Sequence, residues 1–260
     1  MRLPRHRLAA LVAAVALALP GCGAAPAETP PQDRPPLGLM TSLPLYWPAD
    51  AAMADFAAGR AVPPWPRRVI ETRYVLVPLD TLSPIPALAP QEGETDPLAG
   101  LARIAVIQPR GLSPADNVAL DHWVRGGGRL LLALDPALTG DYKQPLGDPR
   151  RPVDAALIPP VLARWGLAMA FDPEQPLAVS KAELAGAVLP LALSGRLSLV
   201  DPAAPCRLLA DGAAARCAIG EGEVTVIADA ALFEHVQLAG ADGAVLLALL
   251  AAALERADRG

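Results

Sequence analysis

The chain has 260 residues, of which 53% are hydrophobic, 19% are charged and only 4% are aromatic. That apolar share excludes an intrinsically disordered protein, and the length is enough to bury a good hydrophobic core. The formal net charge is -5, and the only basic cluster is at the extreme N-terminus, so a nucleic-acid-binding protein is also excluded because phosphates would be repelled.

An export signal is predicted at the N-terminus. Three arginines precede an apolar run over residues 8–19, which is too short to span a bilayer as a helix. The run ends at Leu19-Pro20-Gly21-Cys22, which resembles a bacterial lipobox, whose cysteine is acylated and becomes the first mature residue. We predict a lipoprotein-type signal peptide over residues 1–21 and lipidation of Cys22; an ordinary cleaved signal that contains a cysteine is the alternative.

Residues 22–36 are predicted to form a tether. The segment holds five prolines and few residues that could pack in a core, so it would reach roughly 40 Å in a semi-extended form. The sequence therefore predicts a periplasmic protein held on a membrane by its lipid. Gly23, rather than an aspartate, follows the cysteine, which slightly favours the outer membrane by resemblance to enteric sorting rules.

Residues 37–260 are predicted to form a single α/β domain. Its first elements are a short strand over residues 37–40, a helix over 51–58 and a strand over 69–79, which is rich in β-branched and aromatic residues. A loop over residues 84–97 follows, with four prolines and an acidic patch, and is expected to be mobile or to bind a ligand.

The clearest unit is a β-strand, a helix and a second strand. Residues 103–107 form an apolar strand, and Ser113 is predicted to cap a helix that continues with Pro114 and an acidic third residue. The glycines at 126–128 end this helix, and an apolar strand over residues 129–134 follows. Such a unit places its two strands in parallel in a buried sheet, with helices on both faces.

The C-terminal half is predicted to add antiparallel strands. A helix over residues 155–165 comes first, and the short strands after it lie in an antiparallel elaboration around residues 167–222, with a last strand over 224–228. These strands are expected at residues 167–171, 188–193, 197–200, 206–210 and 214–219. Asp242 is then predicted to cap an apolar core helix over residues 244–254.

Cys206 and Cys217 are predicted to form a disulfide. Asp211-Gly212 between them is a strong signal for a two-residue hairpin turn, since both positions need a positive φ. Folding the chain at this turn places the two cysteines directly opposite each other, within disulfide reach in an oxidising compartment. Two buried free thiols with the turn one residue out of register are the alternative.

The sequence lacks the common motifs for catalysis and cofactor binding. It has no phosphate-binding loop, nucleophile elbow, metal-ligand motif or activated cysteine, so we predict no catalytic residue, no metal and no cofactor. His122 is interpreted as a surface residue of the predicted helix that Ser113 caps. His235 follows the last predicted strand and lies near the edge of a plausible site.

Polar residues follow four predicted strands at the point where each strand ends. In open α/β sheets, ligands bind beyond the carboxyl ends of the strands, so these residues could form a rim that binds a ligand or partner, with two carboxylates facing Arg110. Alternatively, the polar groups simply cap the turns that follow the strands. The rim residues are Thr41, Ser42, Gln108, Arg110, Asp135 and Asp229.

Two stretches resemble one known family. Residues 107–116, with Gly127-Gly128-Arg129 and Leu134-Asp135-Pro136 after them, and residues 220–233 with Asp229, are similar to the extracytoplasmic domain of uncharacterised gliding-motility-type ABC transport auxiliary proteins. The resemblance implies a flavodoxin-like or class I glutamine-amidotransferase-like fold without the nucleophilic cysteine. It also implies a transporter as partner, although longer family members have a transmembrane helix instead of a lipid.

Three hypotheses of function follow. The first is a non-catalytic, lipid-anchored accessory protein that binds an ABC-type transporter, another envelope protein or a small ligand. The second is a hydrolase that uses Asp135 and Asp229 as acid and base, with His235 as a possible third group. The third is a purely structural envelope lipoprotein.

Overall fold

The computed structural model describes residues 34–86 and 93–255. The chain divides into two units, residues 1–33 and 34–260. The predicted signal peptide, Cys22 and most of the predicted tether belong to the first unit and lie outside the described residues. Pro36, predicted as the last tether residue, is already the first residue of a strand. Within the described part of the chain, no helix is long and apolar enough to cross a membrane.

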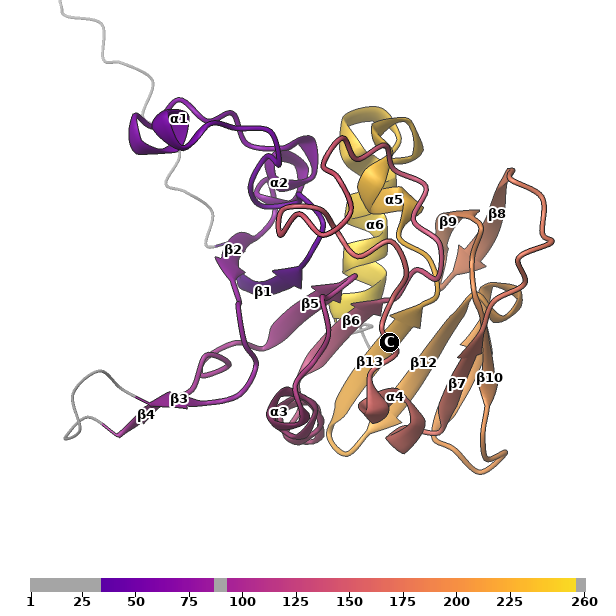
Figure 1. The fold of residues 1–260 in the computed structure, drawn as a ribbon. Helices are drawn as coiled ribbons and strands as arrows, with labels where there is room; N and C mark the ends of the chain where they lie inside the picture. Colours follow the sequence, from indigo (N-terminus) through magenta and orange to yellow (C-terminus); the bar gives the residue numbers. More distant parts are fainter. Residues whose placement is uncertain (1–33, 87–92, 256–260) are drawn as a thin grey trace, which may run out of the picture. The chain divides into compact units, whose positions relative to one another are not determined.

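Seven strands form a central sheet in the order β11-β12-β13-β6-β5-β1-β2 (Figure 1). Five neighbouring strands, from β13 to β2, are parallel, and β12 runs antiparallel to both β13 and β11. The predicted α/β class with a mainly parallel sheet is therefore confirmed. The strands are β1 (Pro36–Thr41), β2 (Val75–Pro78), β5 (Arg103–Ile107), β6 (Arg129–Ala133), β11 (Cys206–Leu209), β12 (Ala214–Ile219) and β13 (Gly222–Ile227).

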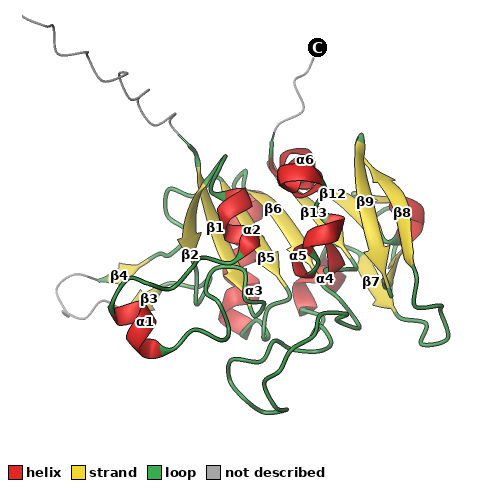
Figure 2. Cartoon of the chain, turned by 90° about the horizontal axis from the view of Figure 1, so that it is seen from above, coloured by secondary structure: helices red, strands yellow, loops and turns green. Residues whose placement is uncertain are grey.

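Helices cover both faces of this sheet, as the buried parallel strands require (Figure 2). The side chains of α6 (Ala244–Leu254) pack in one hydrophobic cluster with residues of α2 (Trp65–Ile70) and α5 (Ala231–Glu234). A second cluster, on the other face, contains residues of α3 (Pro114–Arg125) and α4 (Pro160–Arg164). Because successive strand residues point to opposite faces, the two clusters share every central strand.

The predicted helix start at Ser113 is confirmed. The Ser113 hydroxyl accepts a hydrogen bond from the Asp116 amide at 3.0 Å, and the Asp116 carboxylate accepts one from the Ser113 amide at 3.1 Å, which is a capping box. Burial raises the pKa of Asp116, but hydrogen bonds from Ser113, Thr81 and the backbone of residues 82 and 83 outweigh it and hold the pKa well below its usual range. The helix ends at Arg125, before the predicted glycines.

Antiparallel strand pairs complete the predicted elaboration. The β8–β9 hairpin (Val179–Leu184 and Ala187–Ala192) has its buried leucines in the cluster of α6, whereas β7 (Leu167–Ala170) and β10 (Arg196–Leu199) contribute to the cluster of α3. A third pair, β3 (Ile85–Pro86) with β4 (Glu94–Thr95), lies within the predicted loop over residues 84–97. The remaining elements are α1 (Met53–Ala57) and the short 3-10 helices Ala210–Gly212, Val236–Leu238 and Ala241–Gly243.

Two predicted elements in the first two thirds of the chain are wrong in their bounds. Residues 69 and 70 belong to α2 rather than to a strand, because Pro66 in the first turn favours a helix from Trp65, whose last turn buries Ile70. The helix predicted over residues 155–165 is only α4, since Pro159 and Pro160 exclude a helix through the preceding residues and permit one only from Pro160 onward.

Two further expectations about the C-terminal half are corrected. The expected strand over residues 224–228 is β13, which is parallel to β6 and lies in the middle of the main sheet, outside the antiparallel elaboration. Asp242 does not cap α6; it sits in a left-handed conformation in the preceding turn, and Gly243 with φ 75° takes the cap position. The strand β8 has no counterpart among the sequence predictions.

The predicted register of the two cysteines is confirmed. Cys206 on β11 pairs directly with Cys217 on β12, with Cα atoms 4.0 Å apart and a disulfide between them. Asp211 and Gly212 have φ values of 53° and 90°, the positive values that the two-residue turn needs. The disulfide therefore links the outermost strand of the sheet to its neighbour.

Candidate functional site

The carboxyl ends of the parallel strands bring the predicted rim residues to one edge of the sheet. Ser42 follows β1, Gln108 follows β5, Asp135 lies just beyond β6 and Asp229 just beyond β13. All four are buried, and Gln108 and Asp135 have no exposed surface at all. The arrangement confirms where the topology places these residues, but their burial excludes direct contact with a ligand in this conformation.

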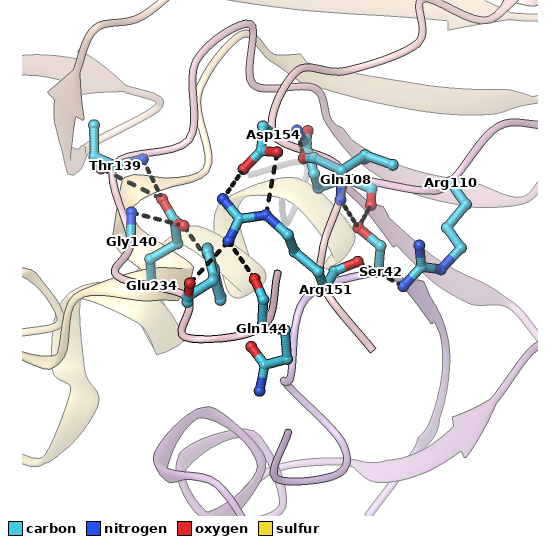
Figure 3. Close-up of polar contacts among 11 residues, drawn as sticks. Ser42, Gln108, Arg110, Thr139, Gly140, Gln144, Arg151, Asp154 and Glu234 are labelled. Atoms are coloured by element: carbon cyan, nitrogen blue, oxygen red, sulfur yellow. Dashed lines mark hydrogen bonds and ion pairs between the residues drawn. The ribbon is translucent and has the colours of Figure 1, made fainter. Parts of the chain in front are cut away.

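Ser42, Gln108 and Asp135 belong to one buried network, of which Figure 3 shows Ser42 and Gln108. The Ser42 hydroxyl donates to the Gln108 carbonyl at 2.6 Å and accepts from the amide of Val153 at 3.3 Å. The Gln108 side chain accepts from the Asp135 amide at 2.8 Å and donates to the carbonyls of Asp135 and Val153, both at 3.0 Å. The network thus joins three strand ends to the segment around Val153.

The two aspartates bind backbone amides with all four carboxylate oxygens. Asp135 accepts from Ala137 at 2.8 Å and from Ala230 at 2.7 Å. Asp229 accepts from Ala192 and from Ala231, both at 2.7 Å. These contacts tie the ends of β6 and β13 to the start of α5 and to the end of β9, so both carboxylates act as caps of the following chain segments.

Burial also changes the acidity of both carboxyl groups. Loss of solvation raises the pKa of Asp135 to about 7, although its two backbone hydrogen bonds oppose the change. Loss of solvation and the nearby charge of Asp135 raise the pKa of Asp229 to about 8. Each aspartate therefore carries a proton for part of the time near neutral pH.

Arg110 does not face the two aspartates, so the expected pocket between them does not form. Its guanidinium is exposed and donates to the backbone carbonyls of Pro149 and Arg151. Thr41 is also used locally, because its hydroxyl accepts the amide of Leu43 at 3.0 Å in the turn after β1. Both residues hold backbone segments, as Ser42 and Gln108 do.

Four of the rim residues, Ser42, Gln108, Arg110 and Asp135, contact the long segment after β6, residues 136–155. Glu234 on α5 holds its first half: its carboxylate accepts from the amides of Thr139 and Gly140 at 3.1 and 3.0 Å and from the Tyr142 hydroxyl at 2.6 Å (Figure 3). Burial, and then the charge of Glu234, raise the pKa of Tyr142 well above its usual range.

Arg151 holds the second half of the same segment. One of its terminal nitrogens donates to the carbonyls of Tyr142 and Gln144, both at 2.8 Å, and the other pairs with Asp154 at 2.6 Å (Figure 3). Gln144 then donates to the carboxylate of Asp50 at 2.9 Å. The segment after β6 is thereby fixed to the loop after β1.

A cleft of about 300 Å³ opens between these two fixed loops. Residues 43–45, 48–50 and 64–66 line one side, residues 140–144 line the other, and Phe233 and Glu234 line it from α5. The lining combines rings of Trp65, Tyr142 and several prolines with charged groups. Rigid aromatic and proline surfaces beside a few polar groups are typical of binding sites.

A second cleft, of about 290 Å³, lies beside the β8–β9 hairpin. Its charged side chains are Asp172, Lys181, Arg196 and Asp211. Two of its lining residues, Ala210 and Asp211, have positive φ values of 50° and 53°. This cleft is more polar than the first, and it lies in the antiparallel elaboration rather than at the loops after β1 and β6.

His122 and His235, the two histidines of the predicted domain, lie in different surroundings. His122 on α3 is exposed, as its interpretation as a surface residue expected. The Nε2 atom of His235 lies 2.9 Å from the Thr139 hydroxyl and therefore serves the same segment as Glu234. Within the described residues, no group of three or more His, Cys, Asp or Glu side chains is arranged to hold a metal ion.

Sequence reasoning found the rim but missed the residues that shape the cleft. Glu234 and Arg151 carry no motif, and Glu234 binds residues about 94 positions earlier in the chain. The available signal was indirect: an aromatic-poor chain places Tyr46, Trp47, Phe56 and Trp65 within one short stretch. Such a concentration at the loop after a strand end indicates a binding surface.

Comparison with known proteins supports the fold alone. No protein-family model and no curated protein matches the chain. It is similar to the mmIFT52 N-terminal domain, with a TM-score of 0.50 and 10% identity over 86% of this chain and 99% of that one. The alignment with this chain thus covers almost the whole of that domain.

The chain is also similar to parts of two enzymes. One is the exo-beta-1,4-mannosidase Op5Man5 from Opitutaceae bacterium strain TAV5, with a TM-score of 0.48 and 15% identity over 86% of this chain and 37% of that one. The other is the beta-galactosidase from Rahnella sp. R3, with a TM-score of 0.44 and 12% identity over 84% of this chain and 31% of that one. The chain thus spans less than half the length of either enzyme.

Proposed function

We propose that the protein is a non-catalytic, lipid-anchored periplasmic accessory protein that binds a partner at the cleft between the loops after β1 and β6. The observation that carries the proposal is that the rim carboxylates bind the protein's own backbone. Asp135 and Asp229 are buried and bind four backbone amides, at the start of the segment after β6, at the start of α5 and at the end of β9, so they hold the backbone beside a preformed cleft instead of meeting a substrate.

The same observation weighs against hydrolysis by these carboxylates. A general acid or base must lie within hydrogen-bond reach of the group that it protonates or deprotonates. Asp135 is fully buried, Asp229 is 3% exposed, and His235 contacts Thr139 rather than either aspartate. A purely structural lipoprotein would need no preformed cleft, so the cleft favours the binding role over this third hypothesis.

The envelope location and the kind of partner rest on the sequence. The lipobox-like Leu19-Pro20-Gly21-Cys22 and the proline-rich segment after it support a protein held at a membrane by its lipid. The resemblance to gliding-motility-type ABC transport auxiliary proteins supports a subunit of an ABC-type transporter or of another envelope complex as the partner.

The test is purification of the native, acylated protein in mild detergent, with amine-reactive cross-linking and mass spectrometry. The sequence has two lysines, Lys143 in the proposed cleft and Lys181 in the second cleft. Cross-links through Lys181 therefore serve as the control for cross-links through Lys143. We expect a stoichiometric partner cross-linked through Lys143. A solitary protein would refute the proposal, and cross-links through Lys181 alone would assign the partner to the other cleft.

A further inference from the structure

We propose that the cleft between the loops after β1 and β6 binds a cationic side chain, a guanidinium or an ammonium group, that a protein partner presents. This inference rests on the binding role proposed above and adds the chemistry of the group bound. It is argued from the charges that line the cleft, from its aromatic side chains and from the surface on its two sides.

The first argument is charge. The charged side chains that line the cleft within the described part of the chain are three carboxylates, Asp50, Asp141 and Glu234, against one ammonium, Lys143. Glu234 already accepts four hydrogen bonds from the segment after β6. Asp50 uses one oxygen for Gln144. Asp141 is exposed and accepts no hydrogen bond from the described residues. Arg150 and Arg151 also interact with Asp50 and Asp141, but each is already paired with another carboxylate, Asp148 or Asp154, so the lining keeps a net negative charge.

The second argument is the aromatic lining. Trp65 and Tyr142 come from opposite sides of the cleft, and both side chains are half-buried. A cation near the face of an aromatic ring is attracted by its quadrupole, and nearby carboxylates add charge-assisted hydrogen bonds. The combination of aromatic rings and carboxylates selects a cation over a neutral group of the same shape.

The neighbouring loop already shows this chemistry within the protein. The guanidinium carbon of Arg67 lies 4.1 Å from the ring centroid of Tyr46 and 5.1 Å from that of Trp47. Trp47 in turn meets Phe56 edge to face at 5.2 Å. These contacts fix the indole of Trp47, which is 54% exposed, in one orientation beside Pro48, a lining residue.

The third argument concerns the source of the cation. Large apolar side chains are exposed next to both sides of the cleft: Trp47 precedes Pro48, and Leu146, which is 82% exposed, follows Gln144 by two residues. A free small amine would not use these groups. A protein segment that places a basic side chain in the cleft would cover both, since the central anchor of a protein interface is surrounded by contacts that exclude water.

The test compares two probes of matched shape. Nα-acetylargininamide (argininamide below) carries a guanidinium as its only charge, and Nα-acetylcitrullinamide (citrullinamide below) replaces it by a neutral urea; acetylation removes the α-ammonium group from both probes. By calorimetry on the mature protein, we expect argininamide to bind at least about ten-fold more tightly than citrullinamide, since only the cation gains from the carboxylates and rings. Equal affinities, or no binding of argininamide, would overturn the proposal.

Variants locate the site. Asp141→Asn and Asp50→Asn should each weaken argininamide binding about five-fold, as expected for loss of one solvent-exposed charge partner; the asparagine at 50 keeps an oxygen for Gln144. Trp65→Leu should weaken it by a similar factor. Asp80→Asn is the control, because Asp80 is an exposed carboxylate that does not line the cleft. An equal loss in this control would overturn the assignment.

A peptide distinguishes a protein partner from a free amine. Acetyl-Leu-Arg-Leu-amide should bind more tightly than argininamide, and Trp47→Ser should remove that difference while leaving argininamide binding unchanged. No gain from the peptide would overturn the assignment to a protein. If a partner is recovered from the membrane but cross-links away from Lys143, the proposed function stands and this inference fails. If argininamide binds as expected but no partner is recovered, the preference of the cleft for a cation stands, whereas the proposed function and the protein source of the cation both fail.

Discussion

The Asp135 carboxylate accepts a hydrogen bond from the amide of Ala230, the residue directly after Asp229. The two aspartates thus lie at the ends of adjacent parallel strands, and each caps the backbone that leaves the sheet there. Four backbone N–H groups, three of them buried, find their acceptors in this pair. The pair joins the parallel sheet, α5 and the β8–β9 hairpin at one point, and its role is best tested through stability.

Replacing either aspartate should destabilise the fold. Asp229→Ala leaves the amides of Ala192 and Ala231 without acceptors, and Asp135→Ala does the same to Ala137 and Ala230. Since an unsatisfied buried donor costs about 1–3 kcal/mol, we expect each variant to lose about 3 kcal/mol in the free energy of unfolding in urea.

The control is Asp80→Ala, which replaces an exposed carboxylate and should change stability by less than about 0.5 kcal/mol. Unchanged stability in both Asp135→Ala and Asp229→Ala would contradict the capping role. It would return these carboxylates to the list of candidate catalytic groups.

The same pair should make stability depend on pH. Burial raises the pKa of Asp135 to about 7 and that of Asp229 to about 8, from the ordinary aspartate value of 3.8. The folded state therefore binds more protons than the unfolded chain between about pH 4 and pH 8, and stability falls as pH rises through this window.

Urea unfolding of the wild-type protein and of an Asp135→Asn/Asp229→Asn variant at pH 5 and pH 8.5 checks this expectation. The wild type should lose stability between these two pH values, on the order of 4 kcal/mol for a shift of this size in one group. The neutral variant should lose much less. Equal losses in the two proteins would show that the aspartates keep ordinary pKa values in the folded state.

The disulfide should stabilise the folded protein because it lowers the conformational entropy of the unfolded chain. The bond closes a loop between residues that are 11 apart in sequence, and the chain-entropy account gives about 3 kcal/mol for a loop of this size. Reduction should therefore lower the denaturation midpoint of the wild type. The Cys206→Ala/Cys217→Ala variant should be less stable and insensitive to reductant, and a wild type that is equally insensitive would refute the contribution.

Local patterns predicted the parts of the fold that local physics decides. The capping sequence at Ser113 defined the start of α3, and the turn at Asp211-Gly212 defined the register of the cysteines. The prediction failed at β8, a polar strand that is stabilised by its partner β9 and by packing of the hairpin on the rest of the domain. Such tertiary stabilisation leaves little trace in the local sequence.

The candidate site also has a part that the sequence predicted and a part that depends on long-range contacts. Chain order alone placed Ser42, Gln108, Asp135 and Asp229 at one edge, because parallel strands end together. The shape of the cleft depends on hydrogen bonds between residues far apart, such as Glu234 with Gly140 and Gln144 with Asp50. No spacing rule connects such residues before the topology is known, and the expected contact of Arg110 with the aspartates was wrong for that reason.

Lipidation of Cys22 is expected to control where the protein resides. Cys22→Ser removes the thiol that would be acylated, so the variant should lack the mass of the lipid and move from the membrane to the soluble periplasmic fraction. Fractionation with mass spectrometry of the N-terminal peptide checks both outcomes. Retention of the variant in the membrane fraction would show that another part of the molecule holds it there.

Glu234 should control the order of the cleft. In Glu234→Gln, an amide group replaces one of the two oxygens that now accept from Thr139, Gly140 and Tyr142, so a donor would face donors. We expect a loss of about 1–3 kcal/mol in stability and faster amide hydrogen exchange over residues 139–144, with exchange in β5 and β6 unchanged. Glu221→Gln, at an exposed turn, is the control. If the exchange of residues 139–144 were the same in both variants, Glu234 would not be the group that fixes this side of the cleft.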